Sequence, residues 1–241
     1  MAITIQEAKS KAADTDKFKH YTNMYDFYLQ SLSNESINIL EIGVKDGKSL
    51  RLWSEIFPNA TIYGLDIDPR CKQYETDRIK VFIGDQGKRE TFEAFGDVKF
   101  DVIIDDGSHV SEHMEKSFQY LWADKLNLGG FYFIEDVSMI FHDRFLGQQQ
   151  DVGKFEAFLN VCIRKLHLDN FSNRIIGRRL KEKPKHRANH NHDIAKKAER
   201  LIGVSTRDFD NDILYVHIYP NLIVYRKKFN LDLTVHDQFK I

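Results

Sequence analysis

Short apolar runs alternate with polar, helix-periodic stretches along the first 140 residues. Apolar runs predict strands at 37–42, 61–65, 79–83, 100–104 and 131–134, and the last two are rich in Val, Ile and Phe without alternation. Such runs are typical of strands that are buried on both faces of a parallel sheet. The stretches between them predict helices at 49–56, 88–95 and 112–126. This alternation predicts a doubly wound, mostly parallel α/β sheet.

The two ends of the chain follow other patterns. Residues 6–33 carry an apolar stripe at helical spacing and predict a helix, as do residues 152–168. The basic segment 174–200 predicts a loop that runs into a short helix. Apolar runs at 213–219 and 222–226 are separated only by a Pro-Asn pair, which predicts a terminal antiparallel hairpin.

Composition narrows the functional classes. In the 241 residues, 35 Lys and Arg nearly balance 36 Asp and Glu, so no overall field favours nucleic acid or an anionic membrane. Cys71 and Cys162 match no metal-ligand spacing, which favours a reduced, cytoplasmic protein. The N-terminal segment lacks the apolar core of a signal peptide, and no apolar run is long enough to span a bilayer.

Paired acids follow two of the predicted strands directly. Asp105 and Asp106 end the fourth strand, and Glu135 and Asp136 end the fifth. In open α/β sheets the carboxyl ends of the strands form the ligand-binding edge. Carboxylates that converge there repel one another unless a cation lies among them. The sequence therefore predicts a hard divalent cation at this edge.

The turn after the first strand, E-I-G-V-K-D-G-K-S at 41–49, narrows the choice of ligand. A phosphate-binding loop needs four residues between its first Gly and G-K-S, and here there are three. The dinucleotide pattern G-x-G-x-x-G also fails, because Lys45 lies between Gly43 and Gly47. What remains is E-x-G-x-x-x-G followed by Asp66, an acid suitably placed for ribose hydroxyls. A turn opened by Glu41 suits a ligand with a cationic amino-acid end, such as S-adenosylmethionine. The alternative is an ordinary strand-to-helix turn with solvent-facing acids.

With these motifs the chain resembles the class I S-adenosylmethionine-dependent methyltransferases, and among them the metal-dependent O-methyltransferases of macrolide sugars. The resemblance covers most of residues 15–137. Its specific elements are I-I-D-D-G-S-H at 103–109 and G-G-F-Y-F-I-E-D at 129–136, whereas the glycine turn is common to many methyltransferases. It implies a Rossmann-like fold and one domain over 1–241. The expected parts are an N-terminal helical lid (1–33), a cofactor-binding core (34–145), a helical and basic insertion (146–205) and the terminal hairpin (206–228).

The resemblance also implies roles for individual residues. Glu41, Gly43 and Asp66 would hold the amino-acid end and ribose of S-adenosylmethionine, and Asp85 and Gln86 would lie near the adenine. The full set of candidate cofactor-binding residues is Glu41, Gly43, Gly47, Asp66, Asp85, Gln86, Asp105, Tyr21 and Lys17, the last two from a lid.

Metal and proton-transfer roles fall on the acidic motifs. The resemblance implies that Asp106, Glu135 and Asp136 ligate Mg²⁺ and that His109 is the general base, so Asp106 and His109 are the candidate catalytic residues. A bound divalent ion can fix an acceptor hydroxyl and lower its pKa, and a neutral imidazole can accept the proton.

Several of these residues have other interpretations. His109 is a candidate cap for a helix starting near Ser111, and Asp105 is a candidate acceptor for backbone N–H groups at its turn. His113 fits an exposed helix face better than the site. His186, His190 and His192 fit a solvated basic loop better than a transition-metal site. Trp53 and Trp122 fit the core.

The predicted function is methyl transfer to a carbohydrate hydroxyl of an antibiotic, a nucleotide-linked sugar or a surface polysaccharide. The alternatives are methylation of a non-sugar small molecule, a cephalosporin-hydroxylase-like activity and a non-catalytic nucleotide-binding protein. The expected partners are a small-molecule or glycan acceptor, with no nucleic acid and no membrane span. Relatives are often oligomeric, which leaves a homo-oligomer open.

Overall fold

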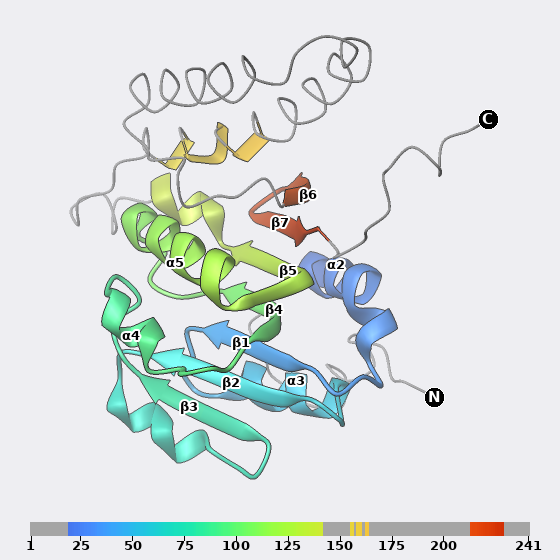
Figure 1. Ribbon diagram of the computed structural model, residues 1–241, viewed down its shortest axis with the longest axis vertical. Coiled ribbons are helices and arrows are strands. Elements are labelled where there is room, and N and C mark those ends of the chain that lie inside the picture. The colour runs from blue at the N-terminus through green and yellow to red at the C-terminus, as the bar shows by residue number, and fades with distance from the viewer. Residues whose placement is uncertain (1–18, 142–154, 157, 161, 164–212, 229–241) are drawn as a thin grey trace, which may run out of the picture.

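A seven-stranded sheet forms the centre of the protein, in the order β3-β2-β1-β4-β5-β7-β6 (Figure 1). The computed structural model describes residues 19–141, 155–156, 158–160, 162–163 and 213–228. Strands β1 to β5 are parallel, and β7 pairs antiparallel with both β5 and β6. The strands are β1 (Asn38–Ile42), β2 (Thr61–Asp66), β3 (Ile79–Ile83), β4 (Phe100–Asp105), β5 (Leu126–Glu135), β6 (Ile213–Tyr219) and β7 (Leu222–Lys227). The predicted α/β sheet and its terminal antiparallel hairpin are confirmed.

Helices pack on both sides of this sheet, as a doubly wound fold requires. The α-helices are α2 (Lys19–Leu29), α3 (Lys48–Ile56), α4 (Arg89–Glu93) and α5 (Ser111–Asp124). Short 3₁₀ helices are η1 (Gln30–Leu32), η2 (Pro69–Tyr74) and η3 (Val137–Phe141). No helix within the described residues is long and apolar enough to cross a membrane.

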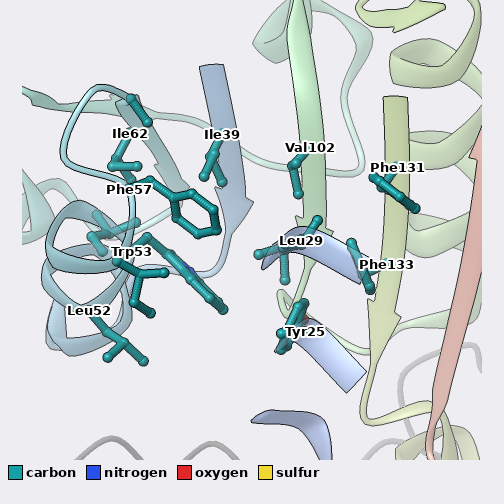
Figure 2. Packing of buried hydrophobic residues seen from close by; sticks show 14 of the residues in the cluster. Tyr25, Leu29, Ile39, Leu52, Trp53, Phe57, Ile62, Val102, Phe131 and Phe133 are labelled. Atoms are coloured by element: carbon teal, nitrogen blue, oxygen red, sulfur yellow. The ribbon is translucent and has the colours of Figure 1, made fainter. Parts of the chain in front are cut away.

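One hydrophobic cluster joins α2 and α3 to the sheet (Figure 2). The Tyr25 ring meets Trp53 edge-on at 5.0 Å and Phe133 at 4.8 Å between centroids. Tyr25 and Trp53 are fully buried. Because burying each large aromatic contributes a few kcal/mol, this contact fixes α2 firmly beside the end of β5.

The opposite face is covered by α5. Phe118 stacks on Trp122 at 4.9 Å and contacts the rings of Tyr132 from β5 and Tyr225 from β7. The prediction that Trp53 and Trp122 belong to the core is confirmed, since both are buried.

Strand β5 differs from its prediction. It begins at Leu126, not at residue 131, and α5 ends at Asp124. A bulge explains the difference: Phe100 pairs with Leu126 and Val102 with Phe131, so β5 inserts extra residues between two paired positions. Gly129, with φ of +74°, permits the required turn of the backbone. Gly129 and Gly130 therefore lie inside the strand.

Other predicted boundaries are also shifted. Helix α4 ends at Glu93, before the predicted residue 95, and the helix η2 was not predicted. Asp68 starts η2, because its carboxylate accepts the Arg70 N–H at 2.9 Å and Pro69 follows it. Within the predicted helix 152–168, residues 155–156, 158–160 and 162–163 are helical. Residues 6–18 and the basic segment 174–200 lie outside the described residues.

Candidate active site

A cavity of about 660 Å³ opens at the carboxyl ends of the parallel strands, where the strand order reverses around β1. This is the position at which open α/β sheets bind ligands, and the volume suits a nucleoside-sized molecule. Its wall contains predicted site residues from helix α2 and from the ends of all five parallel strands, namely Tyr21, Gly43, Asp66, Asp85, Gln86, Asp106, His109, Glu135 and Asp136.

The turn after β1 passes very close to the turn after β4. A side chain at Gly43 would place its Cβ 2.1 Å from the Asp106 carbonyl oxygen, and φ there is +94°. Only glycine fits this position. Lys45 has φ of +53°, the left-handed region that glycine enters without strain. Lys45 thus occupies a backbone conformation that glycine would adopt more readily.

Asp66 holds this turn in place. Its Oδ2 accepts the N–H groups of Val44 and Lys45 at 2.8 and 2.9 Å, and its Oδ1 accepts the Asp68 N–H at 2.9 Å. A carboxylate offers about four acceptor positions. Asp66 therefore organises the backbone around the cavity.

Glu41 and Gly47 lie behind this wall. Glu41 is fully buried, and its Oε2 accepts the Ser49 hydroxyl at 2.6 Å. Gly47 is the N-cap of α3, and a Cβ there would meet the Tyr74 ring at 2.5 Å. Neither is among the residues that line the cavity. Both residues stabilise the turn after β1 without lining the cavity.

Gln86 connects the turn after β3 to the turn after β4. Its Nε2 donates to Asp105 Oδ1 and Ser117 Oγ, both at 3.0 Å, and its Oε1 accepts the Ser108 N–H at 2.7 Å. The adjacent Asp85 accepts the Gly87 N–H at 2.8 Å and lines the cavity. The Gln86 amide is thus committed to fixing the loop that carries Asp106 and His109.

Asp105 is buried at the end of β4 and faces away from the cavity. It accepts hydrogen bonds from Gln86 and, at 3.3 Å, from the Tyr132 hydroxyl. Burial raises the pKa of its carboxyl from 3.8 to about 7, and the hydrogen bonds from Gln86 and Tyr132 offset part of that rise. The two acids that end β4 therefore point to different surroundings, Asp105 inward and Asp106 into the cavity.

Replacing Asp105 with Asn should alter how stability depends on pH. Because the folded-state pKa lies above the unfolded one, this group favours folding below about pH 4, and the benefit is lost as pH rises to about 7. The difference corresponds to roughly 4 kcal/mol. Asp105→Asn should therefore gain stability over the wild type progressively between pH 4 and pH 7, as measured by urea unfolding in EDTA.

The control for this measurement is the exposed Asp77, whose replacement by Asn should leave the pH profile unchanged. Parallel profiles for Asp105→Asn and wild type over this range would show that ionising Asp105 does not oppose folding.

A cluster of possible metal ligands lies at the rim of the cavity. Asp106, His109 and Asp136 each offer one ligand atom, and these atoms lie within 4.8 Å of one another. The His109 Nε2 is 3.9 Å from Asp106 Oδ1. Two carboxylates and an imidazole at this spacing fit a divalent cation with a base beside it. The residue at the N-cap of α5 is Val110, so the interpretation of His109 as a cap is not supported.

Glu135, the third predicted ligand, is oriented differently from Asp136. Its Oε1 accepts a hydrogen bond from the buried Tyr25 hydroxyl, and its side chain is buried while still touching the cavity. The structure thus brings Asp106 and Asp136 together with His109, and Glu135 is not part of that cluster.

Two further residues contact the site without having been predicted there. His113 lines the cavity, and its Nδ1 lies 3.0 Å from Ser108 Oγ, so its interpretation as an exposed helix residue was wrong. Asn221 reaches Asp136 from the turn between β6 and β7. Only its position after a proline marked it, and that signal predicts a turn. The candidates Lys17, His186, His190 and His192 lie outside the described residues.

The sheet order and the position of the cavity are those of the Rossmann-like fold of class I methyltransferases. Superposition on solved methyltransferase structures supports this assignment. The MycE methyltransferase from the mycinamycin biosynthetic pathway, in complex with Mg and SAH, matches with a TM-score of 0.71 and 26% identity. The match covers 96% of this chain and 55% of that one. A second MycE complex, which also contains mycinamycin VI, matches with a TM-score of 0.68 and 26% identity over 95% and 55%.

Sequence comparison gives the same relatives. Demethylmacrocin O-methyltransferase from Streptomyces fradiae is 37% identical over 56% of this chain and 35% of its own length. Mycinamicin VI 2''-O-methyltransferase from Micromonospora griseorubida is 37% identical over 53% and 34%. No family model matches the chain. The chain thus spans about a third of these relatives' length, and its resemblance to sugar O-methyltransferases is confirmed.

Proposed function

We propose that this protein transfers a methyl group from S-adenosylmethionine to a carbohydrate hydroxyl with the help of a bound Mg²⁺. The observation that carries the proposal is the convergence of Asp106, His109 and Asp136 at the rim of the cavity. The other walls of the same cavity come from the Gly43 turn and Asp66. Support also comes from relatives named as O-methyltransferases of L-olivosyl-oleandolide and of a rhamnosyl tetracenomycin, and from a related structure that holds Mg and SAH.

In this proposal the cofactor and the acceptor enter the cavity from two sides. The turn at 43–47 and Asp66 hold the amino-acid end and the ribose, and the segment 106–109 faces the acceptor. Methyl transfer from a sulfonium is an in-line displacement, so the protein has to align the acceptor oxygen and remove its proton.

The cation and the general base would have separate roles in activating the acceptor hydroxyl. Asp106 and Asp136 would hold Mg²⁺, which when bound would coordinate a sugar hydroxyl and lower its pKa. His109 lies beside Asp106 and would accept the hydroxyl proton. Glu135 would either supply a further carboxylate oxygen to the cation or add a negative charge near it. The acceptor would be aligned by Asp106 and His109, whose loop is held by the hydrogen bonds of Gln86 to Asp105 and Ser108.

Methyl transfer should be measured with labelled S-adenosylmethionine against deoxysugar nucleotides, glycosylated macrolides and phenols, with Mg²⁺ or with excess EDTA. The proposal expects label in a sugar product only when Mg²⁺ is present. Labelling of phenols alone would contradict the substrate class, and full activity in EDTA would contradict the role of the cation.

A further inference from the structure

The turn between β6 and β7 is bound directly to the end of β5. Asn221 forms hydrogen bonds with three consecutive residues there: it contacts Asp136 and Ser138 through its side chain and Val137 through its carbonyl oxygen. These residues are more than 80 positions earlier in the chain. A turn needs only its own backbone geometry, and φ of +64° at Asn221 satisfies that requirement. The side-chain bonds are therefore additional to what the hairpin requires.

The orientation of the Asn221 amide is fixed by its partners. Only the amide oxygen can accept the Ser138 N–H, which lies 2.6 Å away. The amide nitrogen must then face Asp136, and it donates to Asp136 Oδ1 at 3.0 Å. The side chain thus presents a donor, and not an acceptor, to the carboxylate.

Tyr21 acts on the same oxygen from the other side. Its hydroxyl lies 2.8 Å from both Asp136 Oδ1 and the Asn221 carbonyl oxygen. It also accepts the Asp136 N–H at 3.3 Å. The side chain of Tyr21 is fully buried, so this hydroxyl has a fixed position. Helix α2 and the terminal hairpin therefore meet at one carboxylate.

These bonds leave the two oxygens of Asp136 unequal. Among the described residues, every side-chain hydrogen bond to this carboxylate ends on Oδ1. Oδ2 is then the oxygen available to a cation shared with Asp106. Asp136 also has φ of +52°, a sparsely populated conformation for a residue other than glycine. A residue in such a conformation keeps its orientation only when its neighbours hold it.

We infer that Asn221 is a positioning residue for the cation site: together with Tyr21 it holds Asp136 Oδ1 so that Oδ2 faces the divalent ion. This rests on the proposed function, since it assigns an outer partner to a ligand of the proposed Mg²⁺. Hydrogen-bonded outer partners orient carboxylate ligands, and their loss weakens metal affinity by about 10–100-fold.

The test measures Mn²⁺ binding to the cation-free protein by electron paramagnetic resonance, so it does not depend on activity. Asn221→Gly keeps the left-handed turn without strain and removes only the two side-chain bonds. We expect its Mn²⁺ dissociation constant to rise about 10-fold or more. In activity assays the Mg²⁺ concentration for half-maximal rate should rise, while the rate at saturating Mg²⁺ recovers.

Asn127→Ala is the matched control, because Asn127 also donates to an aspartate, Asp101 Oδ1 at 2.8 Å, at the opposite end of the strands. It should bind Mn²⁺ as the wild type does. Tyr21→Phe removes the other bond to Oδ1, leaves the buried ring in place and should also weaken Mn²⁺ binding. If Asn221→Gly does not fold, the Mn²⁺ affinity of Tyr21→Phe tests whether the hydrogen bonds to Asp136 Oδ1 position the cation ligand.

The outcomes separate this inference from the proposed function. Wild-type affinity in folded Asn221→Gly, or in Tyr21→Phe when the former does not fold, would overturn the positioning role alone. A wild-type protein that does not bind Mn²⁺, or binds it equally well after Asp106→Asn, would overturn the proposed cation site and this inference with it.

Discussion

Replacing Asp106 with Asn is expected to reduce methyl transfer by on the order of 10³-fold or more while S-adenosylhomocysteine still binds. Asp106 contributes a carboxylate to the cluster with Asp136, and its backbone N–H donates to the Ile42 carbonyl at 3.0 Å. The substitution removes a negative charge but keeps the side-chain volume and that backbone bond. The turn that we propose contacts the cofactor therefore stays in place, and the loss falls on cation binding and the chemical step.

The measurement compares initial rates at saturating Mg²⁺ with the dissociation constant for S-adenosylhomocysteine from calorimetry. The exposed Asp97, replaced by Asn, is the control and should show wild-type rates. Activity that survives in Asp106→Asn would remove this residue from the mechanism. Loss of S-adenosylhomocysteine binding would show instead that Asp106 shapes the cofactor pocket.

The second large effect is expected at His109. Its Nε2 lies 3.9 Å from Asp106 Oδ1, and its side chain is mostly buried at the edge of the cavity. Replacing it with Ala should lower the turnover number by about 10²–10⁴-fold, the usual contribution of a general base. Mn²⁺ and S-adenosylhomocysteine should still bind, since the two carboxylates and the glycine turn remain.

The matched control is His217→Gln, because His217 lies in β6 and does not line the cavity. Its turnover should match the wild type. If Mn²⁺ affinity falls as steeply as turnover in His109→Ala, His109 acts as a ligand of the cation. A turnover within a factor of a few of wild type would exclude it as the base.

The chain order of strands and helices could be predicted because each element carries its own pattern. The run 102–104 is apolar and is followed by two acids, which identifies both a buried strand and its functional end. The same logic placed Asp106 and Asp136 at one edge, and the structure brings their ligand atoms together. The start of β5 could not be predicted, because Gly129-Gly130 signals a helix stop as strongly as it signals a bulge.

The finer organisation of the site depends on contacts that are distant in sequence. Tyr25 belongs to the apolar stripe of a helix, and nothing in that stripe indicates that its hydroxyl donates to Glu135. Asn221 follows a proline in a hairpin turn, a signal that predicts only local geometry. Gln86 follows Asp85 in the sequence, and only the folded structure shows that its amide forms hydrogen bonds with Asp105 and Ser108. Tertiary packing decides these roles, so no local pattern reveals them.

Diffraction from a crystal grown with S-adenosylhomocysteine and Mn²⁺ would test the central claim most directly, because the anomalous signal locates the ion. We predict a single strong peak bound by carboxylate oxygens of Asp106 and Asp136, with the cofactor against the Gly43 turn and Asp66. A crystal that contains the cofactor but no anomalous peak between these two residues would contradict the account.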